Sequence, residues 1–268
     1  MKKDGLIILL IVLLVGILGV GLVAKLLSFE PKTEEVVEVT PEPTVEPTPE
    51  PTPEPTPEPT PEFYTDECGQ TLVKATEDLD ERFTDTNSLL ILANKNHSLP
   101  DGYEPADMRQ PDVRRTQETL MRDEAATALE EMFAAAENDG VLLYAVSGYR
   151  SAARQEVLFN NYASRDGVCA AATYSSRPGH SDHQTGLTMD ISNSGGKLNT
   201  AFEDTEEGKW LAVHAHEYGF IMRYPKDKDA ITGYVYEPWH FRYVGKDYAA
   251  QIYEADPNMS FEEFFHTY

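Results

Sequence analysis

The hydrophobic and polar positions of this 268-residue chain divide it into three stretches. An uncharged apolar run from Leu6 to Ala24 is long enough to cross a hydrocarbon layer of about 30 Å as a helix. Residues 30–62 are mostly Glu, Pro, Thr and Val, and cannot form a core. Apolar residues recur at helical and strand spacings only beyond that point. The pattern predicts an anchor with a short cytoplasmic start over residues 1–29, a linker over 30–62 and a globular domain over 63–268.

Charge around the apolar run predicts its orientation. Lys2 and Lys3 precede the run and acid-rich sequence follows it, which places the N-terminus in the cytoplasm. A cleaved signal peptide is the alternative, but the run is longer than a usual signal core and no small-x-small site precedes Lys25. We therefore expect a single-pass protein of the cell membrane, held through residues 6–24, with its domain outside the cytoplasm.

The linker ends in four copies of Pro-Thr-Pro-Glu over residues 47–62. Proline fixes φ and removes hydrogen-bond donors, so this tract favours an extended polyproline helix. With a rise of about 3.1 Å per residue, the whole linker spans roughly 100 Å when straight. Such a spacer suits a domain that works at a distance from the bilayer, for instance within a cell wall. A ligand for a polyproline-reading domain is the alternative, but most such readers belong to another compartment.

The first half of the globular domain begins with a short apolar run. Ser88–Ala93 predicts a buried strand. Residues 115–138 show apolar positions at helical spacing, and Gly140 is placed to end that helix. A strand is expected over Val141–Val146, followed by a loop and a helix-like segment through Asn161 with Ser151 as its N-cap.

The second half alternates quickly between short elements. We expect a strand over Leu187–Ser192, a helix over 206–218, and short strands over 220–224, 234–237 and 241–244. Two small helices end the chain. Strands and helices mixed without βαβ regularity indicate an α+β domain with a mainly antiparallel sheet flanked by helices.

Charge and cysteine content restrict the partners and the compartment. The net charge of −24 argues against nucleic acid or an anionic lipid surface as a partner, because neither would be attracted. Two cysteines occur, Cys68 and Cys169. A disulfide between them is expected if the domain lies outside the cell, and two free thiols are the alternative.

Two short stretches, 177–190 and 237–240, contain the residue types that a hydrolytic zinc site needs. A catalytic zinc usually takes three His or carboxylate ligands, keeps a position for water, and has a carboxylate nearby to remove a proton. His183, Asp190 and His240 can be the ligands, with Glu237 as the base. Strand alternation places Asp190 on the face opposite the apolar residues of 187–191.

Other residues of suitable type are less convincing. His214 and His216 are two apart on a predicted helix and point to nearly opposite sides, so they cannot easily share a metal. His216 also lacks the partner of a His-Glu-x-x-His pattern. Arg150 follows a strand, at the rim of the domain, and a surface ion pair is its alternative role.

Three ordered motifs resemble the vancomycin-resistance-type D-alanyl-D-alanine carboxypeptidases and the related L,D-carboxypeptidases. They are Ser-Gly-Tyr-Arg-Ser (147–151) with Gln155, Ser-x-His-Gln-Thr-Gly-x-x-x-Asp (181–190) and Glu-Pro-Trp-His-Phe-Arg-Tyr-Val-Gly (237–245). The resemblance covers nearly all of residues 85–245. It implies an α+β fold shared with the sonic-hedgehog-like metallopeptidases.

Residue by residue, the resemblance implies one Zn²⁺ ion held by His183, Asp190 and His240. It implies that Glu237 is the base and that Arg150 stabilises the oxyanion. Two further positions, Ser181 and Gln155, match residues that line the family's substrate cleft. Asp182 stands where the family more often has Glu.

The expected function is zinc-dependent removal of the C-terminal D-alanine from peptidoglycan stem peptides. Within the enzyme class, L,D-carboxypeptidase action on a tetrapeptide stem and endopeptidase action stay open, because the zinc motif does not fix the pocket shape. From a different class, the domain could be an inactive module that binds the cell wall. A pure binder has no need of Glu237 beside an open metal position, which argues against that alternative.

Overall fold

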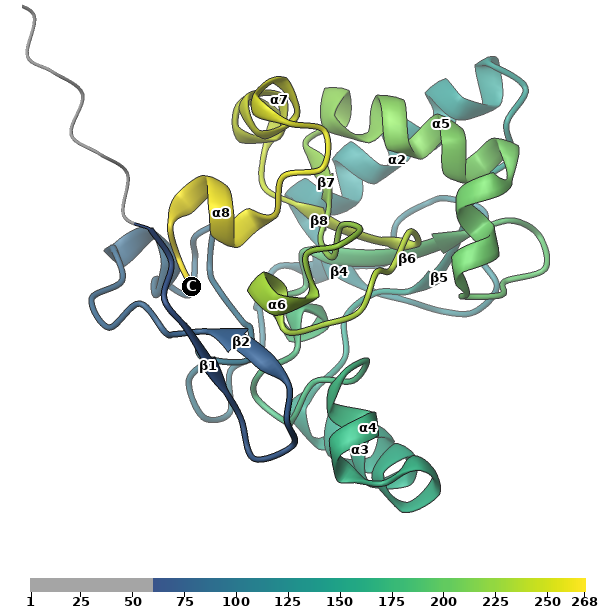
Figure 1. The fold of residues 1–268 in the computed structure, drawn as a ribbon. Helices are drawn as coiled ribbons and strands as arrows, with labels where there is room; N and C mark the ends of the chain where they lie inside the picture. Colours follow the sequence, from purple (N-terminus) through teal and green to yellow (C-terminus); the bar gives the residue numbers. More distant parts are fainter. Residues whose placement is uncertain (1–59) are drawn as a thin grey trace, which may run out of the picture. The chain divides into compact units, whose positions relative to one another are not determined.

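A computed structural model describes residues 60–268. The predicted anchor over residues 6–24 and nearly all of the predicted linker lie outside the described residues. Within residues 60–268, no helix is both long and apolar enough to cross a membrane. The described part is an α+β domain, as expected, with a mixed order of short strands and helices (Figure 1).

The sheet at the centre of the domain has four strands in the order β5-β6-β8-β7, and every neighbouring pair is antiparallel. Two separate hairpin-like pairs, β1-β2 and β3-β4, are also antiparallel. The prediction of a mainly antiparallel sheet is therefore confirmed. The strands are β1 (Phe63–Thr65), β2 (Thr71–Val73), β3 (Met108–Arg109), β4 (Met121–Arg122), β5 (Tyr144–Ser147), β6 (Thr188–Ser192), β7 (Phe220–Met222) and β8 (His240–Tyr243).

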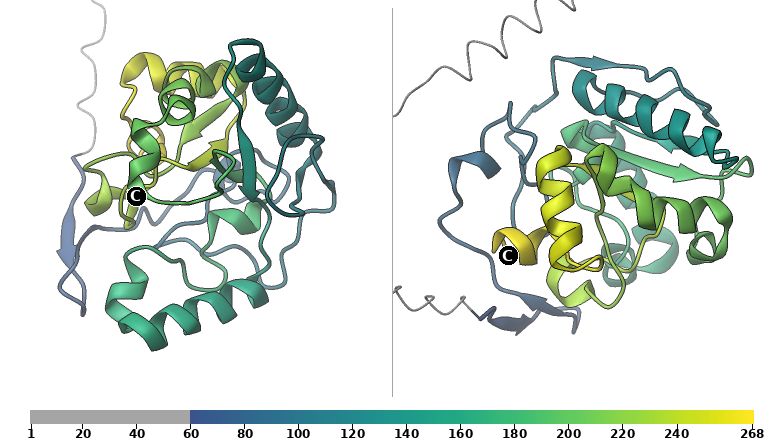
Figure 2. Two further views of the ribbon diagram at one scale, coloured as in Figure 1. Left: turned by 90° about the vertical axis from the view of Figure 1, so that its right-hand side faces the viewer. Right: turned by 90° about the horizontal axis from the view of Figure 1, so that it is seen from above.

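Helices flank this sheet, and Figure 2 shows α2 and α5 running beside it while α3 and α4 pack together away from them. The α-helices are α2 (Asp123–Asn138), α3 (Ala152–Asp166), α4 (Val168–Ala172), α5 (Glu206–His214), α6 (Asp229–Thr232), α7 (Lys246–Ala255) and α8 (Phe261–Phe265). The 3₁₀ turns are η1 (Glu81–Phe83), η2 (Asp182–Thr185), η3 (Thr200–Asp204) and η4 (Ala215–Tyr218).

The two middle strands, β6 and β8, bury both of their faces, but with opposite chemistry. Met189 and Phe241 are partners across the two strands and belong to the main apolar core with the inner residues of α2 and α5. The other face carries Thr188, Asp190, His240 and Arg242, all nearly inaccessible to solvent. Strand alternation was predicted correctly for β6. The second face, however, is a buried polar layer.

Several expected elements have different bounds. The helix expected over 115–138 begins only at Asp123, because the segment before it pairs with the loops around the site. The Arg122 N–H donates to the carbonyl oxygen of Gly186 at 2.8 Å, and the Gln117 amide donates to that of Val146 at 2.7 Å. The N-cap role of Ser151 is confirmed, since its hydroxyl accepts from the Arg154 N–H.

Two predicted strands are wrong. Ser88–Ala93 is buried but forms no strand, because the carbonyl groups of Leu89 and Ile91 accept hydrogen bonds from the Arg242 guanidinium instead of a neighbouring strand. Residues 234–237 form no strand and are not part of the sheet. Their N–H groups donate to scattered carbonyls, as Glu237 does to Tyr224 at 3.1 Å. The apolar pattern of Ser88–Ala93 thus reported burial correctly and backbone pairing incorrectly.

A disulfide joins Cys68 to Cys169, so the expected bridge is present and its free-thiol alternative is excluded. It connects the turn between β1 and β2 to helix α4. The C-terminus also reaches the segment after β2, where the Thr76 N–H donates to the Tyr268 carbonyl at 2.6 Å, and Figure 1 shows the two ends of the domain side by side. The start of the domain is therefore tied covalently to the helices that lie beside the site.

Candidate active site

The three expected metal ligands meet at one point on the polar face of the sheet. Asp190 of β6 and His240 of β8 are direct cross-strand partners, and His183 enters from the turn η2. The His183 Nε2 atom is 3.5 Å from Asp190 Oδ2, and His240 Nδ1 is 3.3 Å from Asp190 Oδ1. Ligands about 2.0 Å from one tetrahedral zinc lie about 3.3 Å apart. The spacing therefore fits one ion of that size.

Each imidazole is oriented by a contact to its other nitrogen. Nδ1 of His183 lies 2.8 Å from the carbonyl oxygen of Gly148, so it carries the proton and leaves Nε2 free on the ligand side. For His240 the assignment is reversed, since Nε2 lies 3.5 Å from Asp182 Oδ2 and Nδ1 faces Asp190. Carbonyl and carboxylate partners of this kind fix the orientation of metal-binding histidines.

The charge state of His183 also fits a cation. Burial and the nearby charge of Arg150 lower the pKa of His183 to about 3, so its imidazole is neutral and able to ligate. Among the described residues, Oδ1 of the buried Asp190 carboxylate accepts no hydrogen bond. A buried carboxylate oxygen without a donor is costly, and a metal ion would satisfy it. The donor set therefore fits zinc.

Glu237 lies beside these residues without being one of the three. Its Oε2 is 3.2 Å from Nδ1 of His240, and its side chain is 12% exposed. Burial raises the pKa of Glu237, although the neighbouring His240 acts in the opposite direction. A carboxyl group with a raised pKa is a better proton acceptor at neutral pH than an ordinary surface glutamate.

Arg150 lines the same cavity and forms no salt bridge with any residue of the range 60–268. Its two terminal nitrogens donate at 2.9 Å, one to the side-chain oxygen of Gln155 and the other to the hydroxyl of Ser147. The amide of Gln155 in turn donates to Ser175 and Ser176. Gln155, 1% exposed, thus uses its polar atoms to hold Arg150.

A cavity of about 460 Å³ contains all seven residues that the sequence singled out. Ser181 is 2% exposed and lines its wall next to the ligands. Helix α3 contributes Tyr162 and Arg165 to its lining, and Tyr174, two residues after the end of α4, lines it as well. The structure therefore brings the predicted set together, although its members are spread over residues 150–240.

Sequence reasoning missed residues that support the site from behind. Gly148 is required because a Cβ there would lie 2.4 Å from the carbonyl oxygen of Leu120, and its own carbonyl orients His183. Arg223 and Arg242, both 0% exposed, lie behind Asp182. Both arginines fall in predicted strands, but that position alone does not indicate burial. Once enclosed, they require carboxylate partners.

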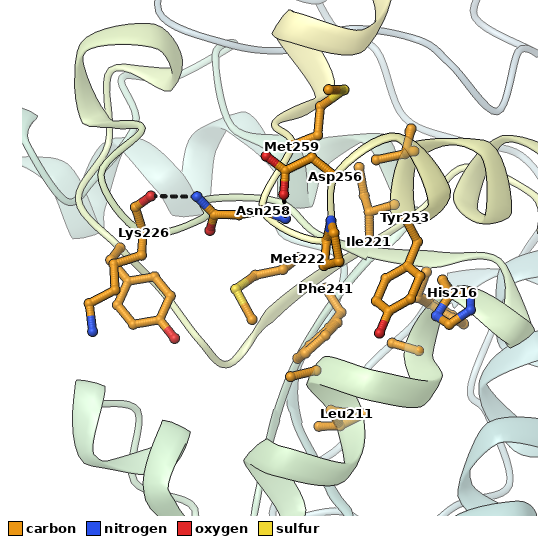
Figure 3. Close-up of a pocket in the computed structure, with 16 residues that line it drawn as sticks. Leu211, His216, Ile221, Met222, Lys226, Phe241, Tyr253, Asp256, Asn258 and Met259 are labelled. Atoms are coloured by element: carbon orange, nitrogen blue, oxygen red, sulfur yellow. Dashed lines mark hydrogen bonds between the residues drawn. The ribbon is translucent and has the colours of Figure 1, made fainter.

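A second cavity, of about 410 Å³, lies between β7, α5, η4 and α7 (Figure 3). Its lining is mainly apolar and includes Leu211, Met222 and Phe241. His216, which the sequence excluded as a ligand, lies here with its ring stacked 3.7 Å from that of Tyr253. His214 instead contacts Glu217. The exclusion of these two histidines agrees with their positions.

Comparison with known proteins identifies relatives of this chain. The VanY model, described as D-alanyl-D-alanine carboxypeptidase, matches residues 118–246. The putative carboxypeptidase YodJ of Bacillus subtilis is 48% identical over 192 residues, which cover 69% of this chain and 70% of that protein.

Solved structures give the same result. The LdcB LD-carboxypeptidase matches with 43% identity and a TM-score of 0.64, over 77% of this chain and 94% of its own. A mutant of the vancomycin-resistance D,D-pentapeptidase VanY in complex with Zn(II) matches with 32% identity and a TM-score of 0.53, over 61% of this chain and 92% of its own.

Proposed function

Because this chain belongs to the VanY family of D-alanyl-D-alanine carboxypeptidases, we propose that His183, Asp190 and His240 hold its catalytic zinc ion and that Glu237 and Arg150 act on the substrate. The protein is a zinc-dependent D-alanyl-D-alanine carboxypeptidase that acts on peptidoglycan stem peptides. The observation that carries the residue assignment is the convergence of these five side chains in one cavity.

The chemistry that zinc supplies at such a site is Lewis acidity, which makes water a stronger nucleophile at neutral pH. Glu237 is the group placed to take a proton from that water. It is largely shielded from solvent beside the ligand His240, and its raised pKa brings its basicity closer to the working pH. After the peptide bond breaks, the same carboxyl group returns the proton to the amine of the leaving D-alanine.

Arg150 supports the developing charge on the substrate. The carbonyl carbon becomes tetrahedral during attack, and its oxygen gains negative charge. A guanidinium fixed by Gln155 and Ser147 needs no reorganisation to stabilise that oxygen. We assign Gln155 and Ser181 to the substrate cleft, with Gln155 acting mainly by holding Arg150.

A second candidate activity is removal of D-alanine from a tetrapeptide stem, where the residue before the broken bond has the L configuration. The likeness to the LdcB LD-carboxypeptidase favours it. The two activities share the zinc ligands and the base, and they differ in the walls of the cavity. An inactive wall-binding module is disfavoured, since the carboxypeptidase relatives and the complete donor set both point to an enzyme.

We further propose that residues 6–24 anchor the chain in the cell membrane and that residues 30–62 hold residues 63–268 on the outer side. The apolar run and its flanking charges support this arrangement. The Cys68–Cys169 disulfide is in keeping with an oxidising compartment. Protease added to intact cells should digest the domain, and protection of the domain would contradict the orientation.

The test of the activity is product analysis. The full-length protein in mild detergent, loaded with one equivalent of zinc, is incubated with pentapeptide and tetrapeptide stems, and the products are identified by mass. Loss of one alanine from the pentapeptide supports the D,D activity, and loss from the tetrapeptide supports the L,D activity. Absence of zinc binding together with absence of alanine release would refute both.

A further inference from the structure

We propose that Glu262, in the C-terminal helix α8, is a positioning residue for the metal site and acts through Arg223 and Asp182 on His240. The inference rests on the proposed zinc site. Glu262 lies outside the residues 118–246 that match the family model. It is 0% exposed, and its side chain points into the domain.

The outer link of this chain of contacts is a paired salt bridge. Both terminal nitrogens of Arg223 donate to Glu262, at 2.8 Å and 2.7 Å, and both side chains are fully buried. Asn94 also donates to Glu262 at 3.1 Å. A two-bond contact between guanidinium and carboxylate fixes the plane of both groups. Glu262 therefore determines how Arg223 lies.

The inner link joins Arg223 to a metal ligand through Asp182. The Arg223 Nε lies 3.7 Å from Asp182 Oδ1, which also accepts a hydrogen bond from Arg242. The second oxygen, Oδ2, accepts from the Thr188 hydroxyl and lies 3.5 Å from Nε2 of His240. One carboxylate oxygen of Asp182 thus contacts the two arginines, and the other faces His240.

The charges of this cluster balance. It contains two cations, Arg223 and Arg242, and two anions, Asp182 and Glu262, in a region closed to solvent. Neutralising Glu262 would leave one uncompensated positive charge behind a site that must accept a dication.

Arg223 also has an unused hydrogen-bond donor with which it can form a new contact when Glu262 is changed. Among the described residues, its buried Nε donates no hydrogen bond. Once Glu262 no longer holds it, Arg223 is drawn toward Asp182, the remaining anion. Asp182 would then orient His240 less firmly, because a released Arg223 joins Arg242 in drawing on its charge. Both effects lower zinc affinity.

The alternative is that Glu262 only docks α8. That helix offers a matched control in Glu263, which forms a 2.7 Å salt bridge with Lys228 and a capping box with Ser260. Glu263 has the same side chain on the same helix, and none of its contacts leads to the metal site. Loosening α8 through Glu263 therefore reproduces the docking effect alone.

The experiment measures the zinc dissociation constant of the full-length protein by competition with a chelator. We expect E262Q to weaken zinc binding about tenfold, the lower end of the effect of outer-shell partners, and E263Q to leave it within about twofold of the wild-type value. Thermal unfolding of the metal-free proteins is measured alongside. Equal zinc affinities for E262Q and wild type would overturn the proposal. It would also be overturned if both variants lost zinc affinity in proportion to their loss of melting temperature.

A double variant gives a second arm. R223M/E262Q removes one charge of each sign and restores neutrality, so it should recover most of the zinc affinity although α8 has lost its salt bridge. Failure to recover would contradict the charge argument. If E262Q does not fold, R223M replaces it. The R223M variant leaves an excess negative charge behind the site, so its zinc binding should not be weaker than that of the wild type. Weaker binding would refute the proposal. A wild-type protein that binds no zinc would instead refute the proposed function.

Discussion

Two cavities of similar volume, about 460 and 410 Å³, lie close together in this domain and differ in the residues that line them. One segment of the chain lines both, since Glu237 lines the first cavity and the preceding residue, Tyr236, lines the second. Each contains a histidine. Nδ1 of His183 contacts the Gly148 carbonyl, whereas the buried Nδ1 of His216 has no hydrogen-bond partner among the described residues. Size and residue type therefore do not identify a site. A site is identified by polar groups that converge on one point and are each held by a second hydrogen-bonding partner.

The largest expected effect comes from the base in the polar cavity. Glu237→Gln keeps the shape of the side chain but cannot accept a proton, so kcat should fall by about 10²- to 10⁴-fold. Zinc content should stay at one equivalent, because Glu237 is not one of the three ligands. D-alanine release and zinc content are measured on the same preparation. Normal turnover would show that another group is the base.

A smaller effect is expected from the guanidinium opposite the ligands. Arg150→Met removes the fixed positive charge and should lower kcat by about 10²- to 10³-fold, as the loss of an oxyanion donor does. The matched control is Arg154→Met, an exposed arginine on the same helix region that does not line the cavity. Steady-state kinetics compare the two variants. An equal, slight loss in both would contradict the role of Arg150.

The apolar cavity should respond in stability alone. Leu211 is 1% exposed, and truncating a buried leucine to alanine costs about 2 to 5 kcal/mol. Leu211→Ala should lower the free energy of unfolding by this amount while turnover per folded molecule stays near the wild-type value. Val213→Ala on the same helix is the control, because Val213 is 50% exposed. A selective loss of turnover in Leu211→Ala would mean that the two cavities are coupled.

The smallest effect is expected from the histidine of the apolar cavity. His216→Ala removes the stack on Tyr253, a contact worth about 0.5 to 1.5 kcal/mol, and leaves zinc content unchanged. Chemical denaturation and metal analysis check both statements. Loss of zinc in this variant would remove the distinction between the two cavities.

The sequence predicted the site better than the elements that carry it. Strand alternation was sufficient to place Asp190, because a period of two is a property of every strand. His240 was proposed as a ligand together with Asp190 from its residue type and from the resemblance. Their direct cross-strand pairing could not be predicted, because the pattern of one strand does not specify its partner strand. The strand expected over Ser88–Ala93 failed for the same reason. Its apolar pattern reported burial, but a distant arginine took its carbonyl groups.

The buried layer behind the site was also beyond prediction. Asp182 was noticed only as a departure from the family pattern. Its partners Arg223 and Arg242 read as ordinary strand residues, because no local pattern indicates that an arginine will be enclosed. Glu262 lies in a helix whose apolar neighbours were enough to predict it. Its pairing with Arg223 becomes visible only when both ends of the domain are folded.

The register of β6 on β8 has a consequence for how this domain can change in length. Met189 faces Phe241 in the core, and Asp190 faces His240 in the site. One inserted residue between His240 and Phe241 would break one of these two pairs, because a shift by a single position turns every side chain to the other face. Insertions between the strands, such as in the loop after Ser192, leave both pairs intact. The packing of the core thus fixes the positions of the metal ligands along the two strands. Length variation among homologous chains is therefore expected in the connecting loops and not in these strands.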